Sequence, residues 1–336
     1  MQKIGRRSVL ALLPAALVLA FQSSCTLSFE VPKPRALQGE AHALYAFAEN
    51  EDVHSLFFRD GVVWGGSNQR AFSFELESQK YRTLMSDPVR LIAGDKERIL
   101  VVPEQVPSGF HAYSPAGTRL FAQNVGAKVD SLISDGTYFF ASGSEGVVRT
   151  GRVTGPSNVF PFVRKPGNLS RLVADVERVF FLQSRDGAET ELWRSSKPEA
   201  DPSGDPTRES NLVLSLAKGT IESIVVDNQF CVFFVDPETA SLQMVWKDGS
   251  EVLPVAGKLG RPSHLVFFEA AQKLVWWDES VHALYQISSV MENGTYGVPQ
   301  KIVDNIYGLR SLVASGDGVV WSNADALFRW RRAQTK

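Results

Sequence analysis

Charged side chains recur at one place in this sequence, directly before a series of short apolar runs. An arginine guanidinium in such a place can bind a carboxylate or a phosphate through two parallel hydrogen bonds. If the runs align in the fold, these residues converge on one site for a small anionic or sugar ligand, with the two acids opposite the cations. The alternative is that charged side chains gathered in this way are hydrated or paired with one another. The candidate ligand-binding residues are Arg90, Arg171, His264, Arg310, Asp130 and Glu222.

A second group has the residue types that proton transfer needs. Trp277-Asp278-Glu279 and His282 hold two acids and an imidazole within six residues. Such groups act as general acids or bases only when a substrate lies within hydrogen-bond reach, so a plain surface loop explains them equally well. The sequence contains no phosphate-binding glycine loop and no HExxH, paired CxxC or GxSxG motif. It therefore assigns no catalytic residue, no metal ligand and no cofactor, although different repeats could still assemble catalytic groups.

A repeat positions these candidates. Each copy reads as an apolar strand, a short turn, a second and almost wholly apolar strand, a polar loop and a third strand. The copies recur about every 43 residues on average, which is the range of a four-stranded β-propeller blade. Helical repeats are disfavoured because the runs are short, β-branched or aromatic, and bounded by Gly, Asp, Asn and Pro. The apolar residues that mark the seven first strands are Leu56, Leu91, Leu132, Leu172, Ile224, Leu265 and Leu312.

The order of strands within a unit follows from residue types. Second strands such as Leu274 to Trp277 are apolar throughout, so neighbouring blades must cover both of their faces. Pro161 and Pro254 fall in fourth strands, which belong at the outer edge because proline lacks the N–H of a central strand. The last unit lacks its fourth strand, and the segment 43–48 can supply it and close the ring. The prediction is an all-β, monomeric, seven-bladed β-propeller of four-stranded antiparallel blades over residues 43–332, with a tail at 333–336.

An acid recurs at the turn between the first and second strands. Aspartate next to glycine or asparagine between two apolar strands is a hairpin signal, because these residues tolerate positive φ and bond their own backbone. The regularity of these acids predicts a structural role on the face opposite the candidate site. They are Asp60, Asp95, Asp135, Asp175, Asp227 and, with a shift, Asp317.

The N-terminal residues read as an export signal. Lys3, Arg6 and Arg7 precede an apolar run over 9–21 that is too short to span a bilayer comfortably, which favours a cleaved signal peptide over 1–24. The arginine pair fits a twin-arginine signal as well as a general secretory one. Residues 25–42 contain prolines and scattered charge without periodicity, so they are predicted to form a flexible tether.

Cysteine usage bears on anchoring. Ser23-Ser24 before Cys25 resembles the lipobox of bacterial lipoproteins, with Gln22 where that family usually has leucine. The resemblance implies lipidation of Cys25 and an exported protein, periplasm-facing or on the cell surface, that contacts the membrane only through its lipid. Cys231 lies in an apolar strand, where a thiol behaves as a small hydrophobic group, so no disulfide is expected. The alternative is that Cys25 is a free thiol near a frayed end.

The longest interruption of the repeat is the segment 195–210, which is rich in Pro, Asp, Ser and Gly and predicts an exposed loop. Its acids do not have the spacing of a calcium-binding EF-hand. The formal net charge of −2 provides no general attraction for nucleic acid, which is therefore not expected among the partners.

The sixth and seventh repeats carry a family resemblance. Leu274-Val275-Trp276-Trp277-Asp278 and Val319-Val320-Trp321-Ser322, each followed by a third strand, resemble bacterial extracytoplasmic propellers of the YWTD and Tol types. The resemblance implies a binding scaffold. We therefore expect a noncatalytic binding or assembly module that presents a propeller face to an envelope protein or a small anionic or sugar ligand. The alternative is a propeller hydrolase or lyase acting on a sugar or lactone at the mouth of the propeller's central channel, where the candidate ligand-binding residues are expected.

Overall fold

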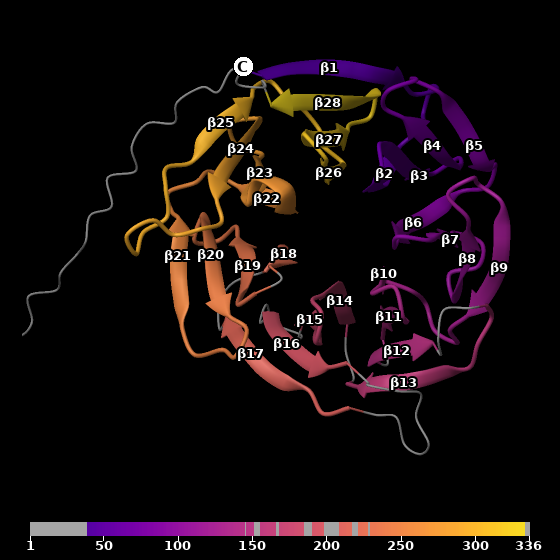
Figure 1. Cartoon of the computed structure of the whole chain (residues 1–336), viewed down its shortest axis with the longest axis horizontal. Coiled ribbons are helices and arrows are strands. Elements are labelled where there is room, and N and C mark those ends of the chain that lie inside the picture. The colour runs from indigo at the N-terminus through magenta and orange to yellow at the C-terminus, as the bar shows by residue number, and fades with distance from the viewer. Residues whose placement is uncertain are drawn as a thin grey trace, which may run out of the picture. The chain divides into compact units, whose positions relative to one another are not determined.

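The described part of the chain forms a ring of seven antiparallel sheets, each with four strands (Figure 1). The computed structural model describes residues 39–144, 146–150, 155–165, 168–184, 190–197, 208–216, 221–227 and 229–332. In six of the sheets the first strand in sequence lies innermost and the fourth outermost, and in the seventh β26 lies innermost and the N-terminal strand β1 outermost. The predicted seven-bladed β-propeller is confirmed.

The first four blades follow one another along the chain. Their strands are β2 (Val53–Arg59), β3 (Val62–Ser67), β4 (Ala71–Glu75) and β5 (Tyr81–Met85); β6 (Val89–Gly94), β7 (Ile99–Pro103), β8 (Gly109–Tyr113) and β9 (Arg119–Asn124); β10 (Ser131–Ser134), β11 (Phe139–Gly143), β12 (Gly146–Thr150) and β13 (Val159–Arg164); and β14 (Asn168–Ala174), β15 (Arg178–Ser184), β16 (Thr190–Ser196) and β17 (Asn211–Leu216).

The last three blades complete the ring. Their strands are β18 (Ser223–Val226), β19 (Cys231–Asp236), β20 (Ser241–Trp246) and β21 (Val252–Ala256); β22 (Pro262–Phe268), β23 (Lys273–Asp278), β24 (Ala283–Ser288) and β25 (Gln300–Val303); and β26 (Ser311–Ser315), β27 (Gly318–Ser322), β28 (Ala326–Arg332) and β1 (Gly39–Ala46). Among the described residues, the 3-10 turn η1 (Glu269–Ala271) between β22 and β23 is the one helical element.

Strand β1 closes the ring by pairing antiparallel with β28, as predicted (Figure 1). It begins at Gly39 rather than at residue 43 and ends at Ala46 rather than Ala48, so residues 39–42 belong to the sheet and not to the tether. The reason is that β28 extends to Arg332, which pairs with Gly39 and gives the N-terminal strand a longer edge to bond.

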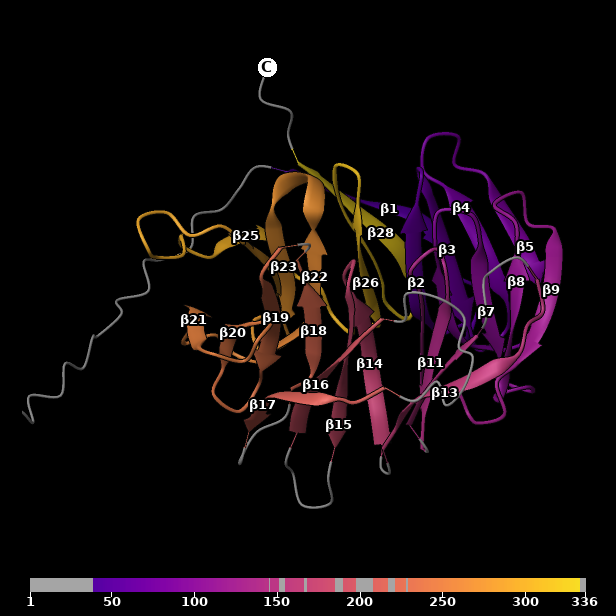
Figure 2. The same cartoon turned by 60° about the horizontal axis from the view of Figure 1, so that its bottom comes forward.

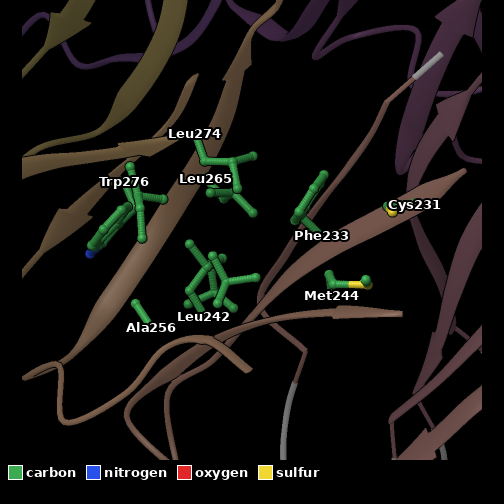
Figure 3. Packing of buried hydrophobic residues seen from close by; sticks show 11 residues of the cluster. Cys231, Phe233, Leu242, Met244, Ala256, Leu265, Leu274 and Trp276 are labelled. Carbon is green, nitrogen blue, oxygen red and sulfur yellow. The ribbon is translucent and has the colours of Figure 1, made fainter. Parts of the chain in front are cut away.

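Apolar side chains hold neighbouring blades together. Between the fifth and sixth blades, Phe233 and Met244 pack with Leu265 and Trp276, and each of these four side chains is buried (Figure 3). The second strands β7 and β19 are buried along their whole length, as their continuous apolarity predicted. The prolines Pro161 and Pro254 lie in the outermost strands β13 and β21, where no further strand needs their N–H.

The innermost strands run roughly along the ring axis, so the ring has two distinct faces (Figure 2). We call the face where the innermost strands begin the mouth face; it also carries the loops between second and third strands. We call the other one the turn face; it carries the hairpin turns between first and second strands. The antiparallel order places every candidate ligand-binding residue on the mouth face and the recurring aspartates on the turn face.

Several predictions fall outside the described residues. These are the signal peptide over 1–24, the lipidation site Cys25, the tether up to residue 38, the central part of the loop over 195–210, and the tail at 333–336. Within the part of the chain that is described, no helix has the length and apolarity required to cross a bilayer.

Candidate binding site on the mouth face

The residue directly before each marker residue links its innermost strand to the next blade. Four of the seven are serines, and each bonds the backbone of the following innermost strand. Such bonds fix the spacing of the innermost strands around the axis at four of the seven junctions between blades. The four pairs are Ser311 Oγ with Leu56 N at 3.1 Å, Ser55 Oγ with Ile92 N at 2.9 Å, Ser131 Oγ with Leu172 N at 3.0 Å, and Ser223 Oγ with Leu265 O at 3.3 Å.

Two of the predicted site arginines are paired across blades. Arg90 Nη2 donates to Asp130 Oδ1 at 2.6 Å, which joins the second blade to the connection entering the third. Arg310 Nε lies 3.2 Å from Asp52 Oδ1, which joins the connections entering the seventh and first blades. For these residues the structure favours the alternative that rim charges neutralise each other. Asp52 was not among the predicted residues, and only the closure of the ring brings it to Arg310.

Arg171 and His264 occupy unusual backbone. The pairing of β14 with β15 shifts register between Ser170 and Val173, and that of β22 with β23 shifts between Ser263 and Val266. Inside these β-bulges Arg171 and His264 both have φ of +52°. A left-handed backbone costs an L-residue about 1–2 kcal/mol, and bulges commonly re-aim side chains near binding sites. Both residues therefore adopt a backbone conformation that costs energy. The serines at the same position of other repeats do not adopt it.

Arg171, Glu222 and His264 form one electrostatic group. Burial raises the pKa of the half-buried Glu222 carboxyl above its ordinary value, against the opposing charges of Arg171 and Arg261. Burial of the His264 ring, together with the charge of Arg171, lowers its pKa to about 4, against a hydrogen bond with the backbone of Arg310. His264 is thus neutral at physiological pH. Its ring also lies 3.0 Å from Ser263 Oγ and contacts Trp277 edge-on.

Arg171 differs from the other two arginines in its surroundings. Its side chain is exposed, and among the described residues it makes no ion pair, although its charge acts on Glu222 and His264. The structure thus divides the six predicted residues into the pair Arg90–Asp130, the separately paired Arg310, and the group Arg171, Glu222 and His264. We call this last group the Arg171 cluster.

The acids near His282 have structural partners. The Asp278 carboxylate accepts hydrogen bonds from the backbone N–H of Gly260 at 2.7 Å and of Arg261 at 2.9 Å, and also from Ser280 Oγ at 2.7 Å. Glu279 Oε2 lies 3.0 Å from Arg261 Nη1. These bonds tie the connection entering the sixth blade to the loop after β23.

Among the described residues, the imidazole of this loop packs against an aromatic ring instead of accepting or donating a bond of this kind. The ring of His282 lies with its centroid 4.4 Å from that of Tyr307, at an interplanar angle of 43°. Trp277 Nε1 donates to the backbone oxygen of Ile306 at 3.3 Å. The residues with the most enzyme-like composition therefore brace two connections on the mouth face.

Four of the six recurring aspartates bond the backbone of their hairpin turns, as predicted. One carboxylate oxygen of Asp135 accepts from the backbone N–H of Thr137 at 2.8 Å and of Tyr138 at 2.7 Å, and Asp95, Asp175 and Asp227 make equivalent bonds. The sequence did not indicate their second role. Lys197 Nζ reaches Asp135 at 3.0 Å and Lys247 Nζ reaches Asp175 at 2.7 Å, so a lysine just after a third strand binds the turn of the preceding blade.

Comparisons with known proteins agree on the fold. No family model and no curated protein matches this chain. A virginiamycin B lyase from Staphylococcus aureus, crystallised in a catalytically inactive form with quinupristin, has a TM-score of 0.67 and 11% identity over 88% of this chain and 99% of its own. The β-propeller domain of Myceliophteria thermophila Cps50 (Swd1) has a TM-score of 0.62 and 10% identity over 88% of this chain and 100% of its own.

A third similar structure extends the range of contexts. Kuenenia stuttgartiensis hydrazine synthase has a TM-score of 0.62 and 10% identity, covering 84% of this chain and 96% of that one. At these identities the likeness shows a shared propeller fold alone. The same ring occurs in a lyase, in a synthase and in a domain that carries no reaction in its name, so the fold does not select among functions.

Proposed function

We propose that this chain is a noncatalytic binding or assembly module that holds an anionic group of its ligand or partner at Arg171. The observation that carries the proposal is the contrast among three arginines of the mouth face. Arg90 and Arg310 are paired with carboxylates of neighbouring connections, whereas the exposed Arg171 makes no ion pair within the described residues. A guanidinium with free N–H groups on rigid backbone is preorganised for a carboxylate or a phosphate.

The neighbours of Arg171 favour a sugar-like ligand that carries the anion. Neutral His264 already bonds Ser263 and the Arg310 backbone and adds no second charge to the cluster, whereas the Glu222 carboxyl, whose pKa burial raises, accepts hydrogen bonds and also donates one when protonated. A sugar hydroxyl beside Arg171 can donate to that carboxyl or accept from it. The Arg171 cluster therefore combines one charge contact with hydroxyl recognition.

The noncatalytic part of the proposal rests on the loop after β23. The carboxylates of Asp278 and Glu279 are each engaged by residues of the same face, and the His282 ring packs against Tyr307. A hydrolase or lyase using them would have to give up bonds that hold the connections into the sixth and seventh blades. We further propose that lipidated Cys25 tethers the propeller to an envelope membrane, so that the mouth face can meet a periplasmic or surface partner.

Calorimetric titration with a matched pair of probes tests the binding site. We expect p-nitrophenyl glucuronide to bind and its neutral analogue p-nitrophenyl glucoside to bind at least about tenfold more weakly, since one charge-assisted hydrogen bond contributes about 1.5 kcal/mol or more. Arg171→Asn should weaken glucuronide binding about tenfold, and Arg90→Asn, altered at the equivalent repeat position, should leave it unchanged. Equal losses in both variants, or no binding of the glucuronide, would contradict the proposal. Release of nitrophenolate would instead support the hydrolase alternative.

The intact mass of the mature protein from a bacterial membrane fraction tests the anchor. We expect a lipidated species that begins at Cys25, and release of Cys25→Ala into the soluble fraction. An unlipidated species beginning at another residue would remove the anchor from the proposal. A protein that co-purifies with the wild type but not with Arg171→Asn would identify the partner.

A further inference from the structure

The turn face carries a second recessed site, between the fourth and fifth blades. It is a cavity of about 500 Å³ formed by the turn after β14, the turn after β18 and the turn after β20. None of its lining residues belongs to the Arg171 cluster or to the mouth face. Its volume is within the range of sites that hold a small ligand or a single side chain with its flanking backbone.

Apolar side chains stand at the edge of this cavity, where the turn does not need them. Among the described residues, the two large apolar side chains with the highest exposed fractions are Val176 at 79% and Phe230 at 62%, and both line the cavity. At the position of Val176, directly after the turn aspartate, the second and third blades have Lys96 and Gly136. Gly136 is a residue that hairpin turns favour and Lys96 is a polar one suited to solvent, whereas an exposed valine serves no evident purpose in the turn.

An aromatic wall continues inward from Phe230. Its ring meets that of the half-buried Trp246 at a centroid distance of 6.4 Å and an interplanar angle of 63°. Aromatic faces of this kind attract cations positioned over them, most strongly for tryptophan. The cavity therefore has one wall suited to a flat or cationic group.

The ammonium group of Lys247, at the base of the cavity, is bonded within the chain. Lys247 Nζ, on a side chain only 6% exposed, lies 2.7 Å from Asp175 Oδ2, 2.7 Å from the backbone oxygen of Asp227 and 3.7 Å from Asp227 Oδ1. Burial opposes ionisation of Asp175, but hydrogen bonds from Lys247 and from two backbone N–H groups outweigh it and lower its pKa. The floor is thus a fixed ion pair without a donor left for an incoming anion.

The rim is acidic. Glu177 is 77% exposed, and the nearest cation is Arg178 Nη2 at 3.8 Å. Asp248 on the opposite side is fully exposed, and bonds from Ser250 lower its pKa. Arg194, whose charge also reaches Asp248, is bonded to the backbone oxygen of Lys247. Counting the lining residues, the carboxylates Asp175, Glu177 and Asp248 outnumber the cations Arg178 and Lys247 by one.

We propose that this cavity receives an arginine side chain of a partner polypeptide. The guanidinium plane stacks on the exposed ring of Phe230 beside Trp246, its N–H groups donate to Asp248 and Glu177, and its methylene groups pack beside Val176. Lysine fits less well because its compact ammonium neither stacks nor bonds two carboxylates in a plane. The site lies on the face opposite the Arg171 cluster and does not depend on the function proposed for that cluster.

Titration with N-acetyl-arginine amide, observed through the indole N–H signal of Trp246, tests this site. The signal is assigned with Trp246→Phe, and the neutral isostere N-acetyl-citrulline amide is the matched ligand control. We expect a saturable shift with the arginine probe and affinity at least about fivefold lower for the citrulline probe. Absence of a saturable shift, or equal affinities for the two probes, would overturn the proposal.

Variants distinguish binding at this cavity from nonspecific attraction to surface charge. Asp248→Asn and Phe230→Ser should each weaken the arginine probe by about threefold to fivefold, while circular dichroism and the unfolding midpoint show that the fold persists. Asp60→Asn removes an equally exposed turn-face acid in the first blade and should leave affinity unchanged. A loss in Asp60→Asn as large as that in Asp248→Asn would show nonspecific attraction and overturn the assignment.

Discussion

Arg90 and Arg171 stand at the same position of the repeat, in the second and fourth blades, and their surroundings differ. Arg90 is bonded to Asp130 at 2.6 Å, and on the same side of the ring Arg310 is paired with Asp52. Arg171 is exposed on left-handed backbone and acts on Glu222 and His264 without an ion pair among the described residues. The repeat fixes the position of the side chain in the ring. The neighbouring connection determines whether that side chain is paired within the fold or left available to a ligand.

The largest loss of protein stability is expected on the side of the mouth face where charges are paired, when a buried charge there loses its partner. Arg70 Nε donates to Glu51 Oε1 at 2.8 Å, and the Glu51 side chain is completely buried. Arg70→Met should reduce the free energy of unfolding by about 3 kcal/mol in urea titrations at pH 7, because a buried carboxylate is left without its cation. Arg171→Met is the matched control and should change it by less than about 0.5 kcal/mol. Similar losses in the two variants would remove the distinction between the two sides.

The same variant has a pH signature. Burial opposes ionisation of Glu51, but bonds from Arg70, Ser67 and the Ala48 N–H outweigh it and lower its pKa below the ordinary 4.5. A lowered carboxyl pKa stabilises the fold above the unfolded value, and this stabilisation is lost as pH falls through the folded value. The difference between wild type and Arg70→Met should therefore shrink below about pH 4.5. A difference independent of pH would mean that lost packing, and not the ion pair, causes the effect.

A smaller effect should separate the two arginines themselves. Arg90→Asn should cost about 1 kcal/mol, since it removes a partly exposed ion pair. Arg171→Asn should cost nothing or stabilise slightly, because asparagine tolerates positive φ better than arginine does. Unfolding midpoints in urea measure both. A larger loss at Arg171 than at Arg90 would show that Arg171 is a structural residue and weaken its assignment to binding.

Much of the fold followed from the sequence because its signals are local. The spacing of Leu56 and the later marker residues, and the prolines in β13 and β21, required no knowledge of distant contacts. The start of β1 did require it, since Gly39 is ordered by pairing with Arg332 at the other end of the chain. Local pattern therefore predicts strands well and their boundaries less well.

The candidate site was only partly predictable for the same reason. Position in the repeat singled out Arg90 and Arg171 equally, but nothing local showed that Asp130 would bond one of them, or that a β-bulge would hold the other. The cavity on the turn face left one readable signal, an apolar Val176 where other blades have Lys96 or Gly136. Because the recurring aspartates give every copy of that turn a structural explanation, the departure of one copy does not by itself indicate a binding site.

The titration of His264 should show the smallest effect and the most local one. Its pKa of about 4 reflects burial first and the Arg171 charge second, so Arg171→Asn should move it upward toward the ordinary 6.5. Arg90→Asn should not move it. The ring signals of His264 in NMR, assigned with His264→Gln, measure the shift. An unchanged pKa of His264 in Arg171→Asn would show that the two residues do not interact, and would contradict the Arg171 cluster.

The lowered pKa of His264 also affects stability. The unfolded chain takes up this proton near pH 6.5 and the folded chain only near pH 4, so protonation favours unfolding and stability falls as pH drops between these values. His264→Gln should remove that part of the pH dependence. Urea titrations at pH 6.5 and pH 4.5 of both proteins measure it, and an unchanged dependence in the variant would assign it to other groups.

The most direct test of the central claim observes both arginines in one sample. Arginine Nε–Hε signals, assigned with Arg90→Asn and Arg171→Asn, are followed by NMR while p-nitrophenyl glucuronide is added. The account predicts a saturable shift of the Arg171 signal, none of the Arg90 signal, and little response of either to the neutral glucoside. Equal shifts of the two signals, or a shift of Arg90 alone, would contradict it.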